Sequence, residues 1–494
     1  MPQATQSSPG KSGPAIAKIA AVLPLAIALT HAAVSPSTAT TSAAVTNTPF
    51  TPQVTLAGLK CGVTDSLPCA APYPMLQKGH PVDWWFVFKF NAKAFPGCGT
   101  VENRACPFGG NVQPYKFFGQ QFVYASSETP VLQQGTGCAG AEVSSTPPTA
   151  VAATTGTPIA QPPGSSATDK TTATPVTDPI GATFDEVYNG QFHYVVWNDQ
   201  FYGDPVIKGC SGDGCDSPWG HSKGMVAWND AGEGFVMQVS TPSWPGAGSA
   251  RFPRKPESGN TLGCIKDNDV EVSQHFFALR LSKDDLIQVL AGLINASVVT
   301  DPGNSQIVNN GGPPDVQQLV VKLGTRSDST ALQSTTLSTG VELISKPSKL
   351  AVPPWQMVSA VLGGISLRTA TWWADPQIYS TDGTTVPACW SPSLGKPGAV
   401  EVATIGKWNE KPFALTGGLG TDHNHAKLGV STSGKTPFAI FGDMNQQGTL
   451  SGSTCSSSQN GRGGLFFAMV NSQMSGSLTT LISGDTAPLQ APAK

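Results

Sequence analysis

The chain has 494 residues, which is enough for two or three ordinary domains with sizeable cores. Its formal net charge is −3 and only 12% of its residues are charged, which excludes a broad polycationic surface. Any contact with nucleic acid must therefore be local. The 54 glycines and 42 prolines favour a loop-rich, β-leaning fold over a helical bundle.

The N-terminal segment has the pattern of an export signal. Lys11 and Lys18 precede the apolar stretch from Ile19 to Leu29, and small residues follow it. We predict a signal peptide and processing region over residues 1–39, followed by a disordered lead-in over 40–59. An uncleaved membrane anchor is the alternative, but the run is too short to span a bilayer. The mature protein is therefore expected to be secreted or periplasmic, or lysosomal in an animal host, without membrane attachment.

The ten cysteines all follow this segment. An even number of cysteines in an exported chain favours disulfide bonds, although the sequence does not give their connectivity. Because no C-x2-C pair occurs and no cysteine stands beside a histidine, a zinc site of that kind is disfavoured.

The predicted elements of the first half are mainly strands. Val82–Phe90 is β-branched and aromatic, as in a buried strand. Residues 139–182 have no aromatic side chain and little charge, which indicates a flexible Ser/Thr/Pro-rich insertion. Three further strands are predicted at residues 192–197, 224–228 and 235–239.

Helices and strands alternate farther along the chain. Lys283–Ile294 has a helical apolar stripe, with Ser282 placed to cap it and Asp285 at the third position. A second helix is predicted over residues 316–323, and strands over 428–431 and 437–441. This mixture predicts an α/β (α+β) fold with an N-terminal lobe over residues 60–300 and a C-terminal lobe over 301–488.

Two short His-x-Lys segments, about two hundred residues apart, carry the strongest chemical signal. They are His221-Ser222-Lys223 and His425-Ala426-Lys427. Residues two apart on an extended strand face the same side, so each segment aims one imidazole and one ammonium at one point. Two such units predict a shared site for attack on a phosphodiester without metal. Two unrelated surface turns are the alternative, as is a metal-binding couple of His423 and His425 that lacks an evident third ligand.

Eight segments stand in a fixed order along the chain: Cys61, Pro81–Trp84, Tyr194–Gln200, Gly220–Gly224, Lys407–Asn409, Lys411–Phe413, Gly442–Asn445 and Arg462–Gly464. In this order they resemble the deoxyribonuclease II family over residues 60–485. The resemblance implies two phospholipase D-like lobes, each a mixed β-sheet flanked by helices, related by pseudo-two-fold symmetry.

The chain departs from the family pattern in three places. The family usually has Asp-His-Ser-Lys-Trp where this chain reads Asn424-His425-Ala426-Lys427-Leu428. His425 keeps the spacing to Lys427, so we choose it over His423. The acidic residue after the first motif is displaced, with Asp230 the nearest candidate. Ser240–Pro245 stands where the family commonly offers an asparagine.

The resemblance implies a metal-independent acid endonuclease that cuts DNA without a cofactor and leaves 3′-phosphate and 5′-hydroxyl ends. His221 is expected to be the nucleophile and His425 the general acid. The lysines would hold the non-bridging oxygens. The predicted catalytic residues are His221, Lys223, His425, Lys427 and Asn445. The predicted substrate-binding residues are Asp230, Asn424, Asp443 and Arg462.

Two rival functions and two assemblies stay open. A phospholipase D-like enzyme acting on lipid would share the histidine chemistry. A secreted DNA-binding relative without catalysis would fit the departures, although both His-x-Lys segments are intact. The protein is expected to be either one pseudo-symmetric monomer or a homodimer.

Overall fold

An eight-stranded antiparallel sheet forms the first part of the fold. The computed structural model describes residues 71–94, 121–135, 139–140, 178–210, 214–254, 271–418 and 420–490. The strand order of this sheet is β10 (Val308–Asn309), β6 (His193–Asn198), β7 (Lys223–Trp228), β8 (Gly234–Val239), β9 (Gln274–Leu281), β3 (Trp84–Lys89), β4 (Phe122–Ser126) and β5 (Gln133–Gln134).

A seven-stranded sheet forms the second part, and only its β13–β14 pair is parallel. Its order is β11 (Gln333–Thr336), β12 (Glu342–Lys346), β19 (Gly464–Val470), β18 (Phe438–Gly442), β17 (Leu428–Ser431), β13 (Leu367–Ala370) and β14 (Val400–Val402). Two separate two-stranded sheets are formed by β1 (Met75–Gln77) with β2 (His80–Pro81) and by β15 (Ile405–Trp408) with β16 (Lys411–Ala414). The helices are α1 (Pro179–Tyr188), α2 (Lys283–Asn295), α3 (Pro314–Val320), α4 (Pro354–Val361) and α5 (Ser472–Leu481), with short 3-10 helices at Ser348–Leu350 and Ser458–Gly461.

The two sheets share one aromatic core. Phe277 of β9 stacks on Phe441 of β18 with ring centroids 4.3 Å apart, and Phe86 of β3 lies 4.9 Å from the same ring. These rings are fully buried. Truncating such a ring to alanine costs about 3–5 kcal/mol. The core therefore fixes the ends of the strands, where the polar site lies, relative to one another.

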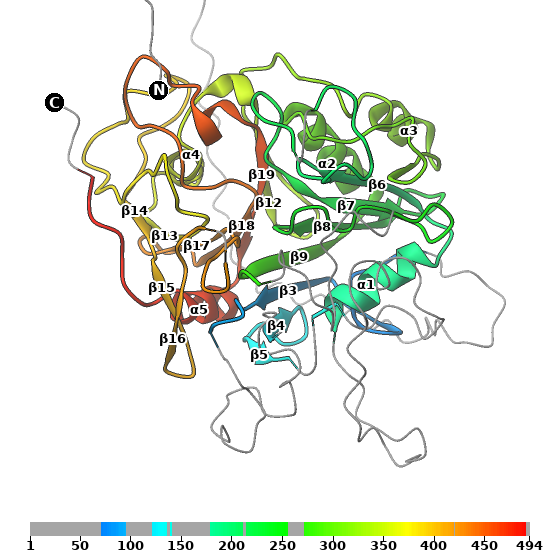
Figure 1. Ribbon diagram of the computed structural model, residues 1–494, viewed down its shortest axis with the longest axis horizontal. Coiled ribbons are helices and arrows are strands. Elements are labelled where there is room, and N and C mark those ends of the chain that lie inside the picture. Colours follow the sequence, from blue (N-terminus) through cyan, green and yellow to red (C-terminus); the bar gives the residue numbers. More distant parts are fainter. Residues whose placement is uncertain are drawn as a thin grey trace, which may run out of the picture. The chain divides into compact units, whose positions relative to one another are not determined.

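Helix α2 also joins the two sheets. It contacts β8 and β9 of one sheet and β12 and β19 of the other (Figure 1). Its N-terminus is the predicted one, because the Ser282 hydroxyl accepts the Asp285 amide and the Asp285 carboxylate accepts the Ser282 amide. The helix ends at Asn295, one residue beyond the prediction.

The predicted fold class is confirmed, since the chain is mixed α+β with large antiparallel sheets. The predicted strands correspond to β3, β6, β7, β8, β17 and β18 within one or two residues at each end. The second predicted helix is present as α3 but starts and ends earlier. The pseudo-two-fold relation between lobes stays a prediction.

Some boundaries differ from the predictions or cannot be compared with them. Strand β10 pairs with β6 of the first sheet although it lies beyond residue 300. Helix α1 begins at Pro179, inside the range predicted as an insertion. The predicted signal, the lead-in and most of that insertion fall outside the described residues.

Four of the ten cysteines are in the described part of the chain, and they form the disulfides Cys210–Cys215 and Cys389–Cys455. The prediction of disulfide bonds is therefore confirmed for these residues. None of the helices within the described ranges is long and apolar enough to cross a membrane.

Candidate active site

Both His-x-Lys segments lie where a strand begins, and the structure brings them together. Lys223 is the first residue of β7, and Lys427 immediately precedes β17. The loop that follows β18 contacts the first segment through His221 and Asp443. Burial is the main cause that lowers the pKa of both imidazoles, and the charge on Lys427 adds to it at His221, as the charge on Lys223 does at His425. Four cationic or titratable groups from two sheets thus share one site.

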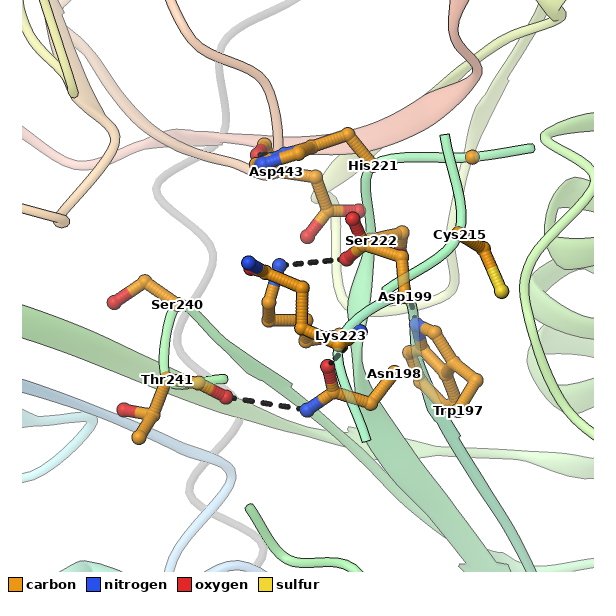
Figure 2. A network of polar contacts seen from close by, with 12 residues as sticks. Trp197, Asn198, Asp199, Cys215, His221, Ser222, Lys223, Ser240, Thr241 and Asp443 are labelled. Atoms are coloured by element: carbon orange, nitrogen blue, oxygen red, sulfur yellow. Dashed lines mark hydrogen bonds and ion pairs between the residues drawn. The ribbon is translucent and has the colours of Figure 1, made fainter. Parts of the chain in front are cut away.

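The His221 imidazole is held in one tautomer. Its Nδ1 lies 2.7 Å from the carbonyl oxygen of Asp443, and Figure 2 shows the two residues side by side. A carbonyl can only accept, so Nδ1 carries the proton and Nε2 keeps its lone pair. Burial lowers the pKa of His221 well below its usual value, Lys223 lowers it further, and Asp199 opposes them. The ring therefore stays unprotonated in mild acid.

A buried ion-pair network surrounds Lys223. Its Nζ donates to Asp199 Oδ1 at 2.6 Å, and Arg462 Nη2 donates to Asp199 Oδ2 at 2.8 Å. Burial would raise the pKa of Asp199, but Lys223, His221 and Arg462 outweigh it and hold that pKa well below its usual value. The carboxylate therefore stays charged and fixes the ammonium through a short, charge-assisted bond.

Arg462 ties the start of β19 to the first motif. Besides Asp199, its guanidinium donates to the carbonyl oxygens of Trp219, Cys215 and Gly220 at 2.6 to 3.1 Å. We predicted a substrate contact for this arginine. The structure places these donors on protein acceptors, where they hold the loop that carries His221.

Each His-x-Lys segment is followed by a glycine that allows close packing. A Cβ atom on Gly224 would lie 2.4 Å from the carbonyl oxygen of Met237. A Cβ atom on Gly429 would lie 2.5 Å from the Trp355 ring. Larger residues at these positions would displace the strand that begins at each lysine.

The environment of His425 is less constrained. Its backbone amide donates to the carbonyl of Ser273 at 2.7 Å, and its ring meets the Trp372 ring edge-on with centroids 4.3 Å apart. Its Nδ1 has no hydrogen-bond partner among the described residues. Burial, then Lys427 and Lys223, lower the pKa of His425 well below its usual value.

Lys427 is a buried cation whose ammonium donates to the carbonyl oxygen of His425. Burial and Lys223 lower the pKa of Lys427 well below its usual value, while Asp199 and Asp443 oppose them. The backbone amide of Lys427 donates to Nδ1 of His275 at 3.1 Å. The ammonium therefore bonds a backbone oxygen and has no bonded carboxylate among the described residues, so it can still pair with an external anion.

Asp443 is buried at the junction of the two sheets. Its carboxylate accepts hydrogen bonds from Gln238 Nε2 and from the Leu465 amide, each at 3.0 Å. Burial raises the pKa of Asp443 to about 7. In mild acid this carboxyl is therefore neutral, and its backbone carbonyl is the part that contacts His221.

Asn445 and Asn424 make local contacts. Asn445 Nδ2 donates to Gln447 Oε1 at 2.7 Å, and its Oδ1 has no partner among the described residues. Asn424 Oδ1 accepts the Ala426 amide at 3.0 Å and its Nδ2 donates to the Ala426 carbonyl. Asn424 thus shapes the turn that carries His425, while Asn445 lies in the loop of Asp443.

The structure does not bring Asp230 into the cluster, and it places His423 beside Asp422. Asp230 follows the far end of β7, so it lies about 20 Å along an extended chain from Lys223. Its carboxylate is 96% exposed and pairs with His193 at 2.8 Å. His423 lies 3.0 Å from the Asp422 carboxylate. In the ranges that the structure covers, no group of three His, Cys, Asp or Glu side chains is placed to hold a metal ion.

Three residues of the site were missed by the sequence reasoning. Asp199 stood inside the matched Tyr194–Gln200 segment, and a carboxylate directly after a buried strand was an available signal. His275 and Trp372 had none, because each lies in an apolar stretch typical of core packing and meets the site only through tertiary contacts.

Fold and site together describe a mixed α+β protein with two imidazoles and two ammonium groups in one cluster, in which His221, Lys223 and Lys427 are buried and His425 is half-buried. The family model described as Deoxyribonuclease II matches residues 164–485, which is more than half of the chain. The chain belongs to the deoxyribonuclease II family and is a deoxyribonuclease-type hydrolase acting on DNA. None of the curated proteins matches it.

Proposed function

We propose that the protein is an acid endonuclease that cleaves DNA without a metal ion, through a phosphohistidine intermediate. The observation that carries the proposal is the hydrogen bond from His221 Nδ1 to the Asp443 carbonyl. This bond leaves the Nε2 lone pair available for attack on phosphorus. The family supports DNA hydrolysis in general; the mechanism and the end products are our proposal.

In the first step, His221 Nε2 attacks phosphorus and the bond to the 5′-oxygen breaks. The leaving oxygen takes a proton from His425 and becomes a 5′-hydroxyl. In the second step, His425 takes a proton from water, and the resulting hydroxide attacks the phosphoryl group. The N–P bond breaks, which regenerates His221 and leaves a 3′-phosphate.

Lys223 and Lys427 would stabilise the charge on the non-bridging oxygens as the transition state forms. Both ammonium groups are almost fully buried, so their interaction with an oxyanion is strengthened by the low dielectric. Asn445 would supply one amide hydrogen in addition to the hydrogen that it gives to Gln447.

An acid pH preference follows from the two imidazoles. The pKa values of His221 and His425 are both lowered, mainly by burial. His221 is therefore ready as a free base in mild acid, whereas His425 must gain a proton. A bound phosphate favours that proton through its negative charge. Activity is expected to rise as the pH falls below the usual imidazole value of about 6.5.

The test is digestion of supercoiled plasmid in EDTA over a range of pH, followed by end-group analysis. We expect nicking at about pH 5, with 3′-phosphate and 5′-hydroxyl termini. A requirement for an added divalent ion, or 5′-phosphate ends, would contradict the mechanism. Hydrolysis of phosphatidylcholine vesicles in place of DNA would favour the lipid-hydrolase alternative.

We also propose that the protein acts outside the reducing cytosol. The bonds Cys210–Cys215 and Cys389–Cys455 suit an oxidising compartment. This agrees with the export signal predicted at the N-terminus.

A further inference from the structure

Ser273, the residue just before β9, holds the backbone of the second His-x-Lys motif. The Ser273 amide donates to the carbonyl of His423 at 2.9 Å, and the His425 amide donates to the carbonyl of Ser273 at 2.7 Å. A parallel bridge joins Ser273 to Asn424. Continued as a ladder, this pairing would next require an acceptor from the chain at His275 for the Lys427 amide.

That acceptor is supplied by a side chain and not by the backbone. The carbonyl of His275 already accepts the Ser240 amide at 3.1 Å within the first sheet. The Lys427 amide donates instead to His275 Nδ1 at 3.1 Å. The imidazole thus completes a ladder that the backbone of β9 leaves unfinished.

We propose that His275 is a positioning residue: its Nδ1 lone pair fixes the Lys427 backbone and thereby aims the Lys427 ammonium and the His425 ring. The inference rests on the proposed function for its catalytic consequence. The contact itself joins the sheet that carries His221 to the segment that carries His425.

Two observations on His275 support a functional role over simple core filling. Its side chain is fully buried, and its Nε2 has no hydrogen-bond partner among the described residues. A buried N–H without a partner costs free energy, so an apolar side chain would suit the core better. The presence of a histidine at this position is therefore best explained by the hydrogen bond that its Nδ1 accepts from the Lys427 amide.

The protonation state of His275 agrees with this role in mild acid. An imidazolium has no lone pair and could not accept the Lys427 amide. Burial, and then the charge of Lys427, lower the pKa of His275 well below its usual value. The acceptor therefore persists at a pH where an exposed histidine is largely protonated.

Three substitutions separate positioning from packing. In His275→Asn the amide oxygen lies near the place of Nδ1 and can still accept from Lys427. His275→Gln carries the same group one methylene farther out, and His275→Leu carries no acceptor. His193→Asn, on β6 of the same sheet, is the matched control for loss of an imidazole outside the cluster.

The measurements are kcat and KM on DNA at about pH 5 in EDTA, with melting temperature as the folding check. We expect His275→Leu and His275→Gln to lower kcat by about 10–100-fold with little change in KM, because a displaced ammonium acts mainly in the transition state. His275→Asn and His193→Asn should stay within about 3-fold of the wild type. Equal kcat values for the Asn and Gln variants would overturn the proposal, even if the Leu variant fails to fold.

Hydrogen exchange gives a second readout that does not depend on activity. In peptides that cover residues 423–428, exchange should be faster in His275→Leu and His275→Gln than in the wild type or His275→Asn. Unchanged exchange in all variants would overturn the proposal. A wild type that is inactive on DNA but shows these exchange differences would overturn the proposed function and leave the positioning role standing.

Discussion

The two His-x-Lys motifs have the same sequence spacing but very different surroundings. Around the first motif, Lys223 is bonded to Asp199 and the His221 tautomer is fixed by the Asp443 carbonyl. Around the second, Nδ1 of His425 has no partner in the described part of the chain, and Lys427 bonds a backbone oxygen. Two motifs with the same sequence spacing therefore differ in the hydrogen bonds and charges around their side chains.

This difference fits the two roles that we propose for the histidines in a two-step phosphodiester hydrolysis. A nucleophile benefits from a fixed tautomer that leaves one ring nitrogen with its lone pair, as at His221. A group that first gives and then takes a proton benefits from an uncommitted ring nitrogen, and Nδ1 of His425 has no partner among the described residues. The contacts thus favour the roles that we propose for the two histidines, whereas the motif alone favours neither assignment.

The largest effect should separate the two histidines through the leaving group. On DNA, His221→Ala and His425→Ala should each lower kcat by about 10⁴-fold. On thymidine 3′-(p-nitrophenyl phosphate), the nitrophenolate departs without a proton, so His425→Ala should release a burst of nitrophenol and retain the thymidine 3′-phosphoryl group on His221. His221→Ala should show no burst.

The burst amplitude is measured by stopped-flow absorbance, with melting temperature as the folding check. A burst from His221→Ala but not from His425→Ala would reverse the assignment. Equal behaviour of both variants on the activated ester would remove the distinction between the motifs.

The two lysines should differ in stability more than in activity. Lys223→Met and Lys427→Met should both lower kcat by about 10²–10³-fold, because each removes a donor for developing charge. Lys223→Met also breaks a buried ion pair, which should cost about 3 kcal/mol in the free energy of unfolding. Lys427→Met removes a buried cation with no bonded carboxylate among the described residues, so its stability should be unchanged or higher.

Chemical denaturation at neutral pH measures this contrast. The double variant Lys223→Met/Asp199→Asn serves as the control, since it removes both charges of this pair while the new amide oxygen can still accept from Arg462, and it should recover part of the lost stability. If both single lysine variants were equally destabilised, the contrast between the two environments would not hold.

Much of the fold followed from local sequence patterns, because local physics determines these elements. Ser282 and Asp285 predicted the start of α2, since capping depends on neighbours three residues apart. The aromatic run at β3 predicted a strand buried along its whole length. The start of α1 at Pro179 was not predicted, because the composition of the preceding segment obscured it.

Only part of the site could be predicted from the sequence. The two motifs were found because His-x-Lys is a local pattern, but their partners come from distant parts of the chain. Asp199 lies 24 residues from Lys223, and His275 lies 152 residues from Lys427. Asp230 was favoured by its closeness in sequence to the first motif, but β7 carries the chain away from the cluster before it.

The last contrast concerns Asp443, the residue between the two environments, and its influence on the pH dependence of stability. Burial raises its folded pKa to about 7, whereas the unfolded pKa is about 3.9. Between these values the native state holds a proton that the unfolded chain has lost. The resulting stability is fully present below about pH 4 and is lost as the pH rises towards 7, by at most about 4 kcal/mol.

Asp443→Asn should flatten this decline, because the amide does not titrate and keeps the backbone carbonyl that His221 contacts. Glu186 offers a matched comparison, since burial raises its pKa to about 8 at a place outside the cluster. Glu186→Gln should flatten the curve by a similar amount without changing kcat. Unfolding free energies from urea titrations at several pH values between 4 and 8 measure both slopes.

An unchanged slope in Asp443→Asn would mean that this carboxyl is already ionised in mild acid. The Asp443 carboxylate would then balance the charge of Lys427, much as Asp199 balances that of Lys223. The two motifs would differ only in the contacts of their histidines.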